Sequence, residues 1–103
     1  MKANIEANTL YIIPETDLVA SRIEELRDDM IQELENNPDA TGVILDVQGI
    51  DIVDSLGVNL IIGLYRQVTA ESKTFEIIGA GDKFMKVANF FRFPTLFTVK
   101  ADS

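Results

Sequence analysis

The segment Val43–Val47 is apolar except at Asp46, a pattern typical of a strand buried on both faces. Phe75–Ile78 is a second short run of this kind. Between them, Leu56–Thr69 is apolar on most sides and long enough to favour a helix. Strands that alternate with helices imply parallel neighbours joined by right-handed crossovers. The alternation therefore predicts an α/β fold.

The flanking segments extend this pattern at both ends. Ile5–Ala7 and Thr9–Ile13 are expected to form two short strands around a turn at Asn8. Asp82–Phe90 predicts a further helix, and Phe97–Val99 predicts a closing edge strand. The expected order is β-β-α-β-α-β-α-β.

The first helix is expected to begin at the segment Ser21-Arg22-Ile23-Glu24, which fits a capping box. In that motif the serine oxygen and the glutamate carboxylate each accept an N–H of the first turn. Asn36–Asp39 is expected to end the helix. The apolar stripe that should face the core consists of Ile23, Leu26, Met30, Ile31 and Leu34. The whole chain is predicted to form one domain over residues 1–103. It should be a mixed β-sheet of about four to five strands, with helices packed mainly on one face.

The net charge of −8 bears on the class of partner. Duplex nucleic acid is a polyanion bound mainly through Lys and Arg, so this charge argues against nucleic acid, and equally against an anionic membrane surface. No stretch approaches the roughly 18 apolar residues of a membrane span, and the first residues do not resemble a signal peptide. We therefore expect a cytoplasmic protein without direct membrane insertion.

Several kinds of catalytic site are incompatible with the composition. The chain has no histidine and no cysteine, which excludes a Ser-His-Asp or Cys-His site and the usual zinc ligands. No Walker phosphate-binding loop is present. Asp46, Asp51 and Asp54 follow a predicted buried strand and are candidates for binding magnesium or accepting a phosphoryl group, but the acidic pair and lysine of a receiver domain lack good counterparts. We expect no enzymatic activity, no cofactor and no metal site.

The segment Asp51–Leu60 is the most informative in the chain. Either Asp54 or Ser55 can cap the predicted second helix. Gly57 is unexpected, because a glycine inside a helix costs about 0.5–1 kcal/mol relative to alanine. One interpretation is that Gly57 leaves the backbone amides bare, so that another molecule can approach them closely. A serine beside such amides at a helix N-terminus is a natural place for a phosphate.

This segment resembles the signature of the STAS domain family, which includes the anti-sigma factor antagonists and the related domain of sulfate transporters. The family pattern begins roughly Asp-Ser-[Ser/Thr]-Gly-[Leu/Val]-Gly, and the chain matches it at Asp54, Ser55, Gly57 and Val58. Leu56 replaces the usual second hydroxyl residue, and Asn59 replaces a common glycine, so Ser55 is the only hydroxyl in the motif. The order of the predicted elements also resembles that family over nearly all of the chain.

The resemblance implies an anti-sigma factor antagonist that works by partner switching. In that mechanism the unphosphorylated antagonist binds an anti-sigma factor that is also a serine protein kinase. Phosphorylation of the motif serine releases it, and a PP2C-type phosphatase resets it. By this resemblance Ser55 is the phosphoacceptor, Asp54 helps to position the site, and Asp17 lies near the contact face. The expected partner-binding residues are Asp17, Asp54, Ser55, Leu56, Gly57 and Asn59.

Two other functions remain open from the sequence. One is a STAS-type docking or regulatory subunit of a membrane transporter or lipid-trafficking complex, without phosphorylation. The other is a sensor that holds a small anionic ligand on the amides of Asp54–Gly57. A weak homodimer is also open, because Phe90, Phe91 and Phe93 cannot all face inward from a helix, and an exposed ring would mark a contact surface.

Overall fold

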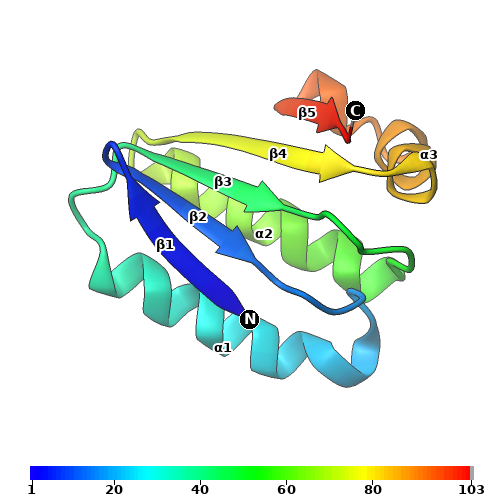
Figure 1. Ribbon diagram of the computed structural model, residues 1–103, viewed down its shortest axis with the longest axis horizontal. Helices are drawn as coiled ribbons and strands as arrows, with labels where there is room; N and C mark the ends of the chain where they lie inside the picture. The colour runs from blue at the N-terminus through cyan, green and yellow to red at the C-terminus, as the bar shows by residue number, and fades with distance from the viewer. Residues whose placement is uncertain (103) are drawn as a thin grey trace.

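The computed structural model describes residues 1–102, and its five strands form one mixed sheet in the order β1-β2-β3-β4-β5 (Figure 1). The strands are β1 (Lys2–Glu6), β2 (Thr9–Ile13), β3 (Gly42–Asp46), β4 (Thr74–Ala80) and β5 (Thr98–Ala101). β1 runs antiparallel to β2, whereas β2 to β5 are parallel to one another. The α/β class and the mixed sheet predicted from the sequence are confirmed.

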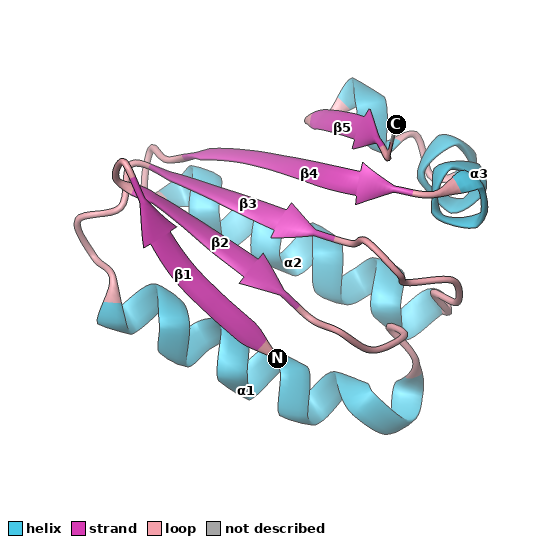
Figure 2. Cartoon of the chain, in the orientation of Figure 1, coloured by secondary structure: helices cyan, strands magenta, loops and turns pink. Residues whose placement is uncertain are grey.

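Two long helices cover one face of this sheet (Figure 2). They are α1 (Ala20–Asn36) and α2 (Ser55–Ala70), whereas α3 (Asp82–Phe90) lies past the end of β4. A short 3-10 helix, η1 (Phe93–Thr95), links α3 to β5. The element order is as predicted, and the helices pack mainly on one face. Among residues 1–102 no helix has both the length and the apolar character that a membrane span requires.

The core lies between the sheet and the two long helices. Val43 and Leu45 of β3 are buried against the helices, as are Leu10 and Ile12 of β2. Ile44 is only half-buried, so the expectation that Val43–Val47 is covered on both faces is wrong for this residue. The physical reason is that both long helices lie on one face, so within residues 1–102 no helix covers the other face of β2 and β3 (Figure 1).

The start of α1 differs from the sequence-based prediction. The helix begins at Ala20, and the cap position is held by Val19, whose side chain makes no capping hydrogen bond. Ser21 and Glu24 are exposed and lie within the helix rather than around its first amide. The predicted capping box is therefore wrong, because the first amide of α1 has a partner from another part of the chain.

Aromatic side chains divide into two groups at the C-terminal end. Phe84 and Phe93 are fully buried, in line with a packing role. Phe90 and Phe91 are exposed, and their ring centroids lie 5.0 Å apart. The expectation that at least one of Phe90, Phe91 and Phe93 is exposed is confirmed.

Candidate functional site

Two connections meet at the edge of the sheet where the parallel strands end. One joins β2 to α1 and the other joins β3 to α2, and Leu18 of the first pairs with Val53 of the second as an isolated parallel bridge. The Leu18 N–H donates to the Ile52 carbonyl oxygen at 2.9 Å, and the Asp54 N–H donates to the Leu18 carbonyl oxygen at 3.1 Å. Residues 34 positions apart are thus held as neighbours beside the first turn of α2.

The side chain of Asp17, the residue before Leu18, also links these two connections. Its Oδ1 accepts the Asp51 N–H at 3.0 Å and the Ile52 N–H at 3.1 Å. The carboxylate therefore serves two amides that would otherwise depend on solvent. The structure brings Asp17 to the segment that contains Ser55, and it shows a positioning role for the side chain.

Asp54 joins the starts of two helices. Its Oδ1 accepts the Gly57 N–H at 2.9 Å, which caps α2, and its Oδ2 accepts the Ala20 N–H at 2.8 Å, which caps α1. Backbone N–H donors hold the pKa of the Asp54 carboxyl below its ordinary value, because they stabilise the ionised form. The largest contribution comes from Gly57, followed by Ala20 and then Leu56. A negative charge at two helix N-termini is also favoured by both helix dipoles.

Gly57 is buried, and its role differs from the sequence-based interpretation. A Cβ at this position would overlap the Leu18 carbonyl oxygen and lie 2.9 Å from Val53 Cγ1. The glycine therefore lets α2 approach the β2–α1 connection, and its own amide is engaged by Asp54. The interpretation that Gly57 leaves its amide bare for another molecule is wrong, whereas its place among the partner-binding residues stays a prediction.

Ser55 lies at the first position of α2, and its side chain is exposed. On either side of it in the sequence, Ile52 and Leu56 expose 57% and 46% of their surfaces although both are apolar. Asn59, one helical turn later, is also exposed. We call Ile52, Ser55, Leu56 and Asn59 the Ser55 face. It combines one hydroxyl with uncharged side chains, a composition suited to burial against another protein.

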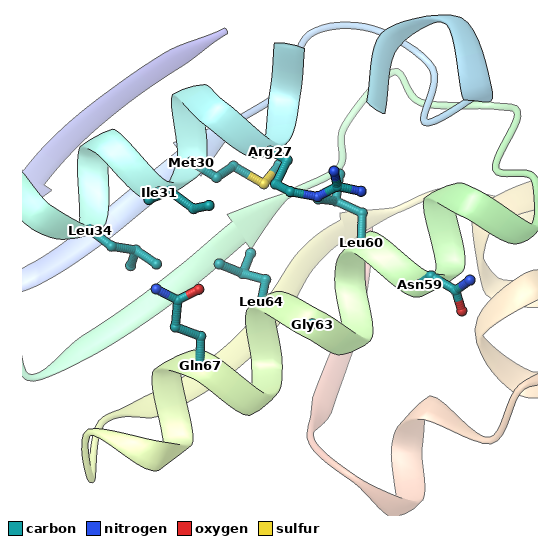
Figure 3. A pocket seen from close by; sticks show the side chains of 9 residues that line it. All are labelled: Arg27, Met30, Ile31, Leu34, Asn59, Leu60, Gly63, Leu64 and Gln67. Carbon is teal, nitrogen blue, oxygen red and sulfur yellow. The ribbon is translucent and has the colours of Figure 1, made fainter. Parts of the chain in front are cut away.

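A groove continues from this face between α1 and α2 (Figure 3). It has a volume of about 170 Å³, and Asn59 lies at the end of it nearest Ser55. Figure 3 shows apolar side chains of α1 facing those of α2 across the groove. The residues that line it are Arg27, Met30, Ile31, Leu34, Asn59, Leu60, Gly63, Leu64 and Gln67.

The carboxylates considered for a metal ion do not gather. Residues 1–102 contain no group of three carboxylate, histidine or cysteine side chains placed to hold one. Asp46 Oδ1 instead accepts the Gln48 N–H at 3.0 Å, and both oxygens of Asp54 are engaged at the two helices. The suggestion of a magnesium site or receiver-like phosphoaspartate at Asp46, Asp51 and Asp54 finds no support.

The amides considered for a small anion are also largely taken. The Asp54 N–H donates to Leu18 and the Gly57 N–H donates to the Asp54 carboxylate. A carboxylate thus already occupies the position where a free anion would seek N–H donors. The geometry favours the protein-docking alternatives over the small-anion sensor.

Sequence reasoning selected most of this site but missed Ile52 and the role of Leu18. Ile52 could have been identified from the sequence, because it is an apolar residue next to Asp51 in a loop, where an exposed apolar side chain is less expected. Leu18 acts through its backbone, which leaves no sequence signature. Of the predicted partner-binding residues, Ser55, Leu56 and Asn59 are exposed at the start of α2. Asp17 and Asp54 lie beside them and accept backbone N–H groups that link the two connections.

Comparison with known proteins agrees with this architecture. The STAS domain family matches the chain over residues 2–103. No curated protein matches the chain significantly in sequence.

Several solved structures share this fold. A putative anti-sigma factor antagonist from Thermotoga maritima is 12% identical, with a TM-score of 0.87 over 96% of this chain and 84% of that one. The phosphorylated form of the Bacillus cell fate determinant SpoIIAA is 19% identical, with a TM-score of 0.72 over 97% and 89%. A sulfate transporter family protein from Wolinella succinogenes is 12% identical, with a TM-score of 0.70 over 93% and 80%. At these identities the likeness establishes the shared fold.

Proposed function

The chain belongs to the STAS domain family, and we propose that it is an anti-sigma factor antagonist that works by partner switching. In its unphosphorylated form it binds an anti-sigma factor that is also a serine protein kinase. Phosphorylation of Ser55 releases that partner, and a PP2C-type phosphatase restores the binding form. The protein acts in the bacterial cytoplasm by binding and catalyses no reaction itself.

The exposure of Ser55 at the first position of α2 is the observation that carries this proposal. A kinase must reach the hydroxyl, and a buried serine would exclude the mechanism. The structure of SpoIIAA in its phosphorylated form, which has the same fold, supports the proposal because it shows that this architecture can carry a phosphate.

The surroundings of Ser55 explain how one phosphate changes binding. Ile52 and Leu56 present apolar surface that gains free energy when a partner covers it, at roughly 25 cal/mol per Å² of apolar area. A phosphate adds about −1.5 to −2 charges at the same place. Burying that charge without a paired cation costs several kcal/mol, so the covered state is lost.

The same phosphate is tolerated by the fold. It would sit at the N-terminus of α2, where the helix dipole favours an anion by about 0.3–1 kcal/mol. Asp54 opposes it, but both oxygens of that carboxylate already accept N–H donors. The switch therefore acts on binding rather than on folding.

The direct test is phosphorylation by an anti-sigma-type serine kinase encoded near this chain, followed by intact-mass measurement. We expect one phosphate on the wild type and none on Ser55→Ala. Ser21→Ala is the matched control, because Ser21 is also an exposed serine in the first turn of a helix. Modification that persists in Ser55→Ala, or that disappears in Ser21→Ala, would refute Ser55 as the acceptor.

A second candidate is a docking subunit of a membrane transporter or lipid-trafficking complex that uses the Ser55 face without phosphorylation. The likeness to the Wolinella succinogenes sulfate transporter family protein favours its consideration. Copurification with transporter subunits, together with no kinase-dependent mass change, would select it over the antagonist.

A further inference from the structure

Three exposed apolar side chains lie within the segment of the chain that contains α3 and η1. Phe90 leaves 79% of its surface exposed, and Phe91 and Leu96 leave 44% each. The rings of Phe90 and Phe91 meet edge to face at 5.0 Å. The Ser55 face does not include these residues, so the proposed partner switch leaves their exposure unexplained.

Positive charge surrounds this apolar surface. Lys83, Lys86 and Phe90 follow one another at spacings of three and four, which places them on one face of α3. Arg92 follows Phe91 directly and is exposed. None of the three cations takes part in the ion pairs formed among residues 1–102. We call Lys83, Lys86, Phe90, Phe91, Arg92 and Leu96 the α3 patch.

The net charge of the chain conceals this local excess. α3 and the turn after it, residues 82–92, contain three basic residues and one acidic residue, Asp82, a net charge of +2; since the whole chain carries −8, the remaining residues carry −10. Lys100 of β5 is outside the patch and pairs with Glu76 at 3.4 Å. Much of the acidity lies on α1, along the margin of the molecule opposite to α3 (Figure 1). The molecule measures 33 × 27 × 23 Å, whereas charges in solution are screened over about 8 Å at physiological salt. A surface that touches α3 therefore meets the local positive charge.

A left-handed residue turns the chain within the patch. Arg92 has φ of 59°, a conformation that L-residues other than glycine adopt at a cost of about 1–2 kcal/mol. This turn sends Phe93 into the core while Phe91 stays outside. An arginine stands where glycine would be less strained, directly after the two exposed rings in the sequence.

We propose that the α3 patch docks the protein on the surface of an anionic lipid bilayer, in addition to any partner bound at the Ser55 face. The rings of Phe90 and Phe91 would enter the boundary between headgroups and acyl chains, and the three cations would pair with anionic headgroups. A deformable surface accepts a ring as prominent as Phe90 without a preformed cavity. The acidic α1 would then point away from the bilayer.

Charge makes a second copy of the chain the weaker occupant. A two-fold contact through the α3 patch would set Lys83, Lys86 and Arg92 against their own copies. A head-to-tail contact is heterologous, so it would extend into rings or open filaments instead of closing a dimer. Anionic lipid complements the patch without the like-charge repulsion of the two-fold contact.

Sedimentation of the full chain with lipid vesicles at low and physiological salt tests this proposal. We expect binding to vesicles of equal parts phosphatidylcholine and phosphatidylglycerol, little binding to phosphatidylcholine alone, and weakening as salt rises. Phe90→Ser should lower the affinity about tenfold. Lys83→Ala and Lys86→Ala should lower it about fivefold each.

Matched controls come from β1, at the other edge of the sheet. Ile5→Ser removes an apolar side chain that is 45% exposed, and Lys2→Ala removes an exposed cation; neither should change vesicle binding. Circular dichroism melting would verify that every variant is folded. Absence of wild-type binding to the anionic vesicles overturns the proposal, as does undiminished binding by Phe90→Ser. If Phe90→Ser instead abolishes self-association in sedimentation velocity, the patch belongs to an interface between copies and the lipid proposal is wrong.

Discussion

Asp54 Oδ2 accepts the backbone N–H of Ala20 at 2.8 Å, so the residue that caps α2 also caps the helix that begins 34 residues earlier. Because Asp54 Oδ1 also accepts the Gly57 N–H, one carboxylate caps the N-termini of both long helices. Ser55 is the next residue, and its position relative to α1 and α2 depends on this arrangement. The position of the Ser55 face is thus coupled to the stability of the fold.

We expect Asp54→Asn to destabilise the protein in a pH-dependent way. The amide can keep an oxygen toward Gly57, but its NH₂ then faces the Ala20 N–H, a donor against a donor. The native bonds lower the pKa of Asp54 below 3.8, so the stabilisation is fully present above that value and is lost as the pH falls through the lowered pKa.

Urea denaturation of both proteins at several pH values measures this effect. The difference in unfolding free energy should be constant near neutrality and should shrink in acid. Asp28→Asn, which removes an exposed carboxylate within α1, serves as the control. A difference that stays constant down to the lowest pH would show that the charge of Asp54 is not what stabilises the helix starts.

Asp17→Ala should loosen the β3–α2 connection. The substitution removes the acceptor of the Asp51 and Ile52 N–H groups, each bond being worth about 0.5–1.5 kcal/mol, toward the low end where water can replace the lost partner. Hydrogen exchange at these two amides should accelerate. Asp17→Asn should largely preserve their protection, since an amide oxygen can still accept both bonds.

Asp51→Ala is the matched control for this experiment, because only the backbone of Asp51 takes part in the bond. Equal protection of the Asp51 and Ile52 amides in Asp17→Ala and wild type would mean that the bonds of Leu18 and Asp54 hold the two connections together without Asp17.

Much of the fold was predictable from the sequence because its signals are local. Apolar runs such as Val43–Val47 and the helical spacing from Ile23 to Leu34 mark each element without knowledge of its neighbours. The cap of α1 was not predictable in this way. Ser21 and Glu24 fit a local pattern, yet the acceptor that the structure uses is Asp54, and no periodicity links residues 34 positions apart.

Gly57 illustrates the same limit within the site. Its cost to the helix is visible in the sequence, and so is its position two residues after Ser55. The reason for a glycine at this position was misassigned, because the Leu18 carbonyl oxygen that excludes a Cβ lies on a different segment. Local chemistry can identify an unusual residue, whereas the atom that requires it comes from the tertiary structure.

Alanine at Gly57 and at Gly63, the two glycines of α2, should have opposite effects. Gly57→Ala places a methyl group against the Leu18 carbonyl and should destabilise the fold by about 1–3 kcal/mol. A Cβ at Gly63 meets nothing within 4 Å, so Gly63→Ala should stabilise the helix by about 0.5–1 kcal/mol. Thermal and urea denaturation of the pair measure both values. Equal effects at the two positions would contradict the close approach of α2 to Leu18.

Charge at Ser55 should separate binding from folding. Ser55→Asp puts a carboxylate at the first position of α2, where the dipole favours it and Asp54 opposes it, so the unfolding free energy should stay within about 1 kcal/mol of wild type. Affinity for the anti-sigma kinase should fall on the order of a hundredfold or more, because the charge would be buried against an apolar face. Ser55→Ala should bind constitutively.

Ser55→Asn is the control for this prediction, because the asparagine side chain has nearly the size of aspartate and carries no charge. Titration calorimetry with the same kinase should find binding by the asparagine variant close to wild type and none measurable by the aspartate variant. If both variants lose binding equally, the face senses the volume of the side chain rather than its charge. A phosphate would then act by steric exclusion, and the apolar neighbours Ile52 and Leu56 would set how closely a partner must fit.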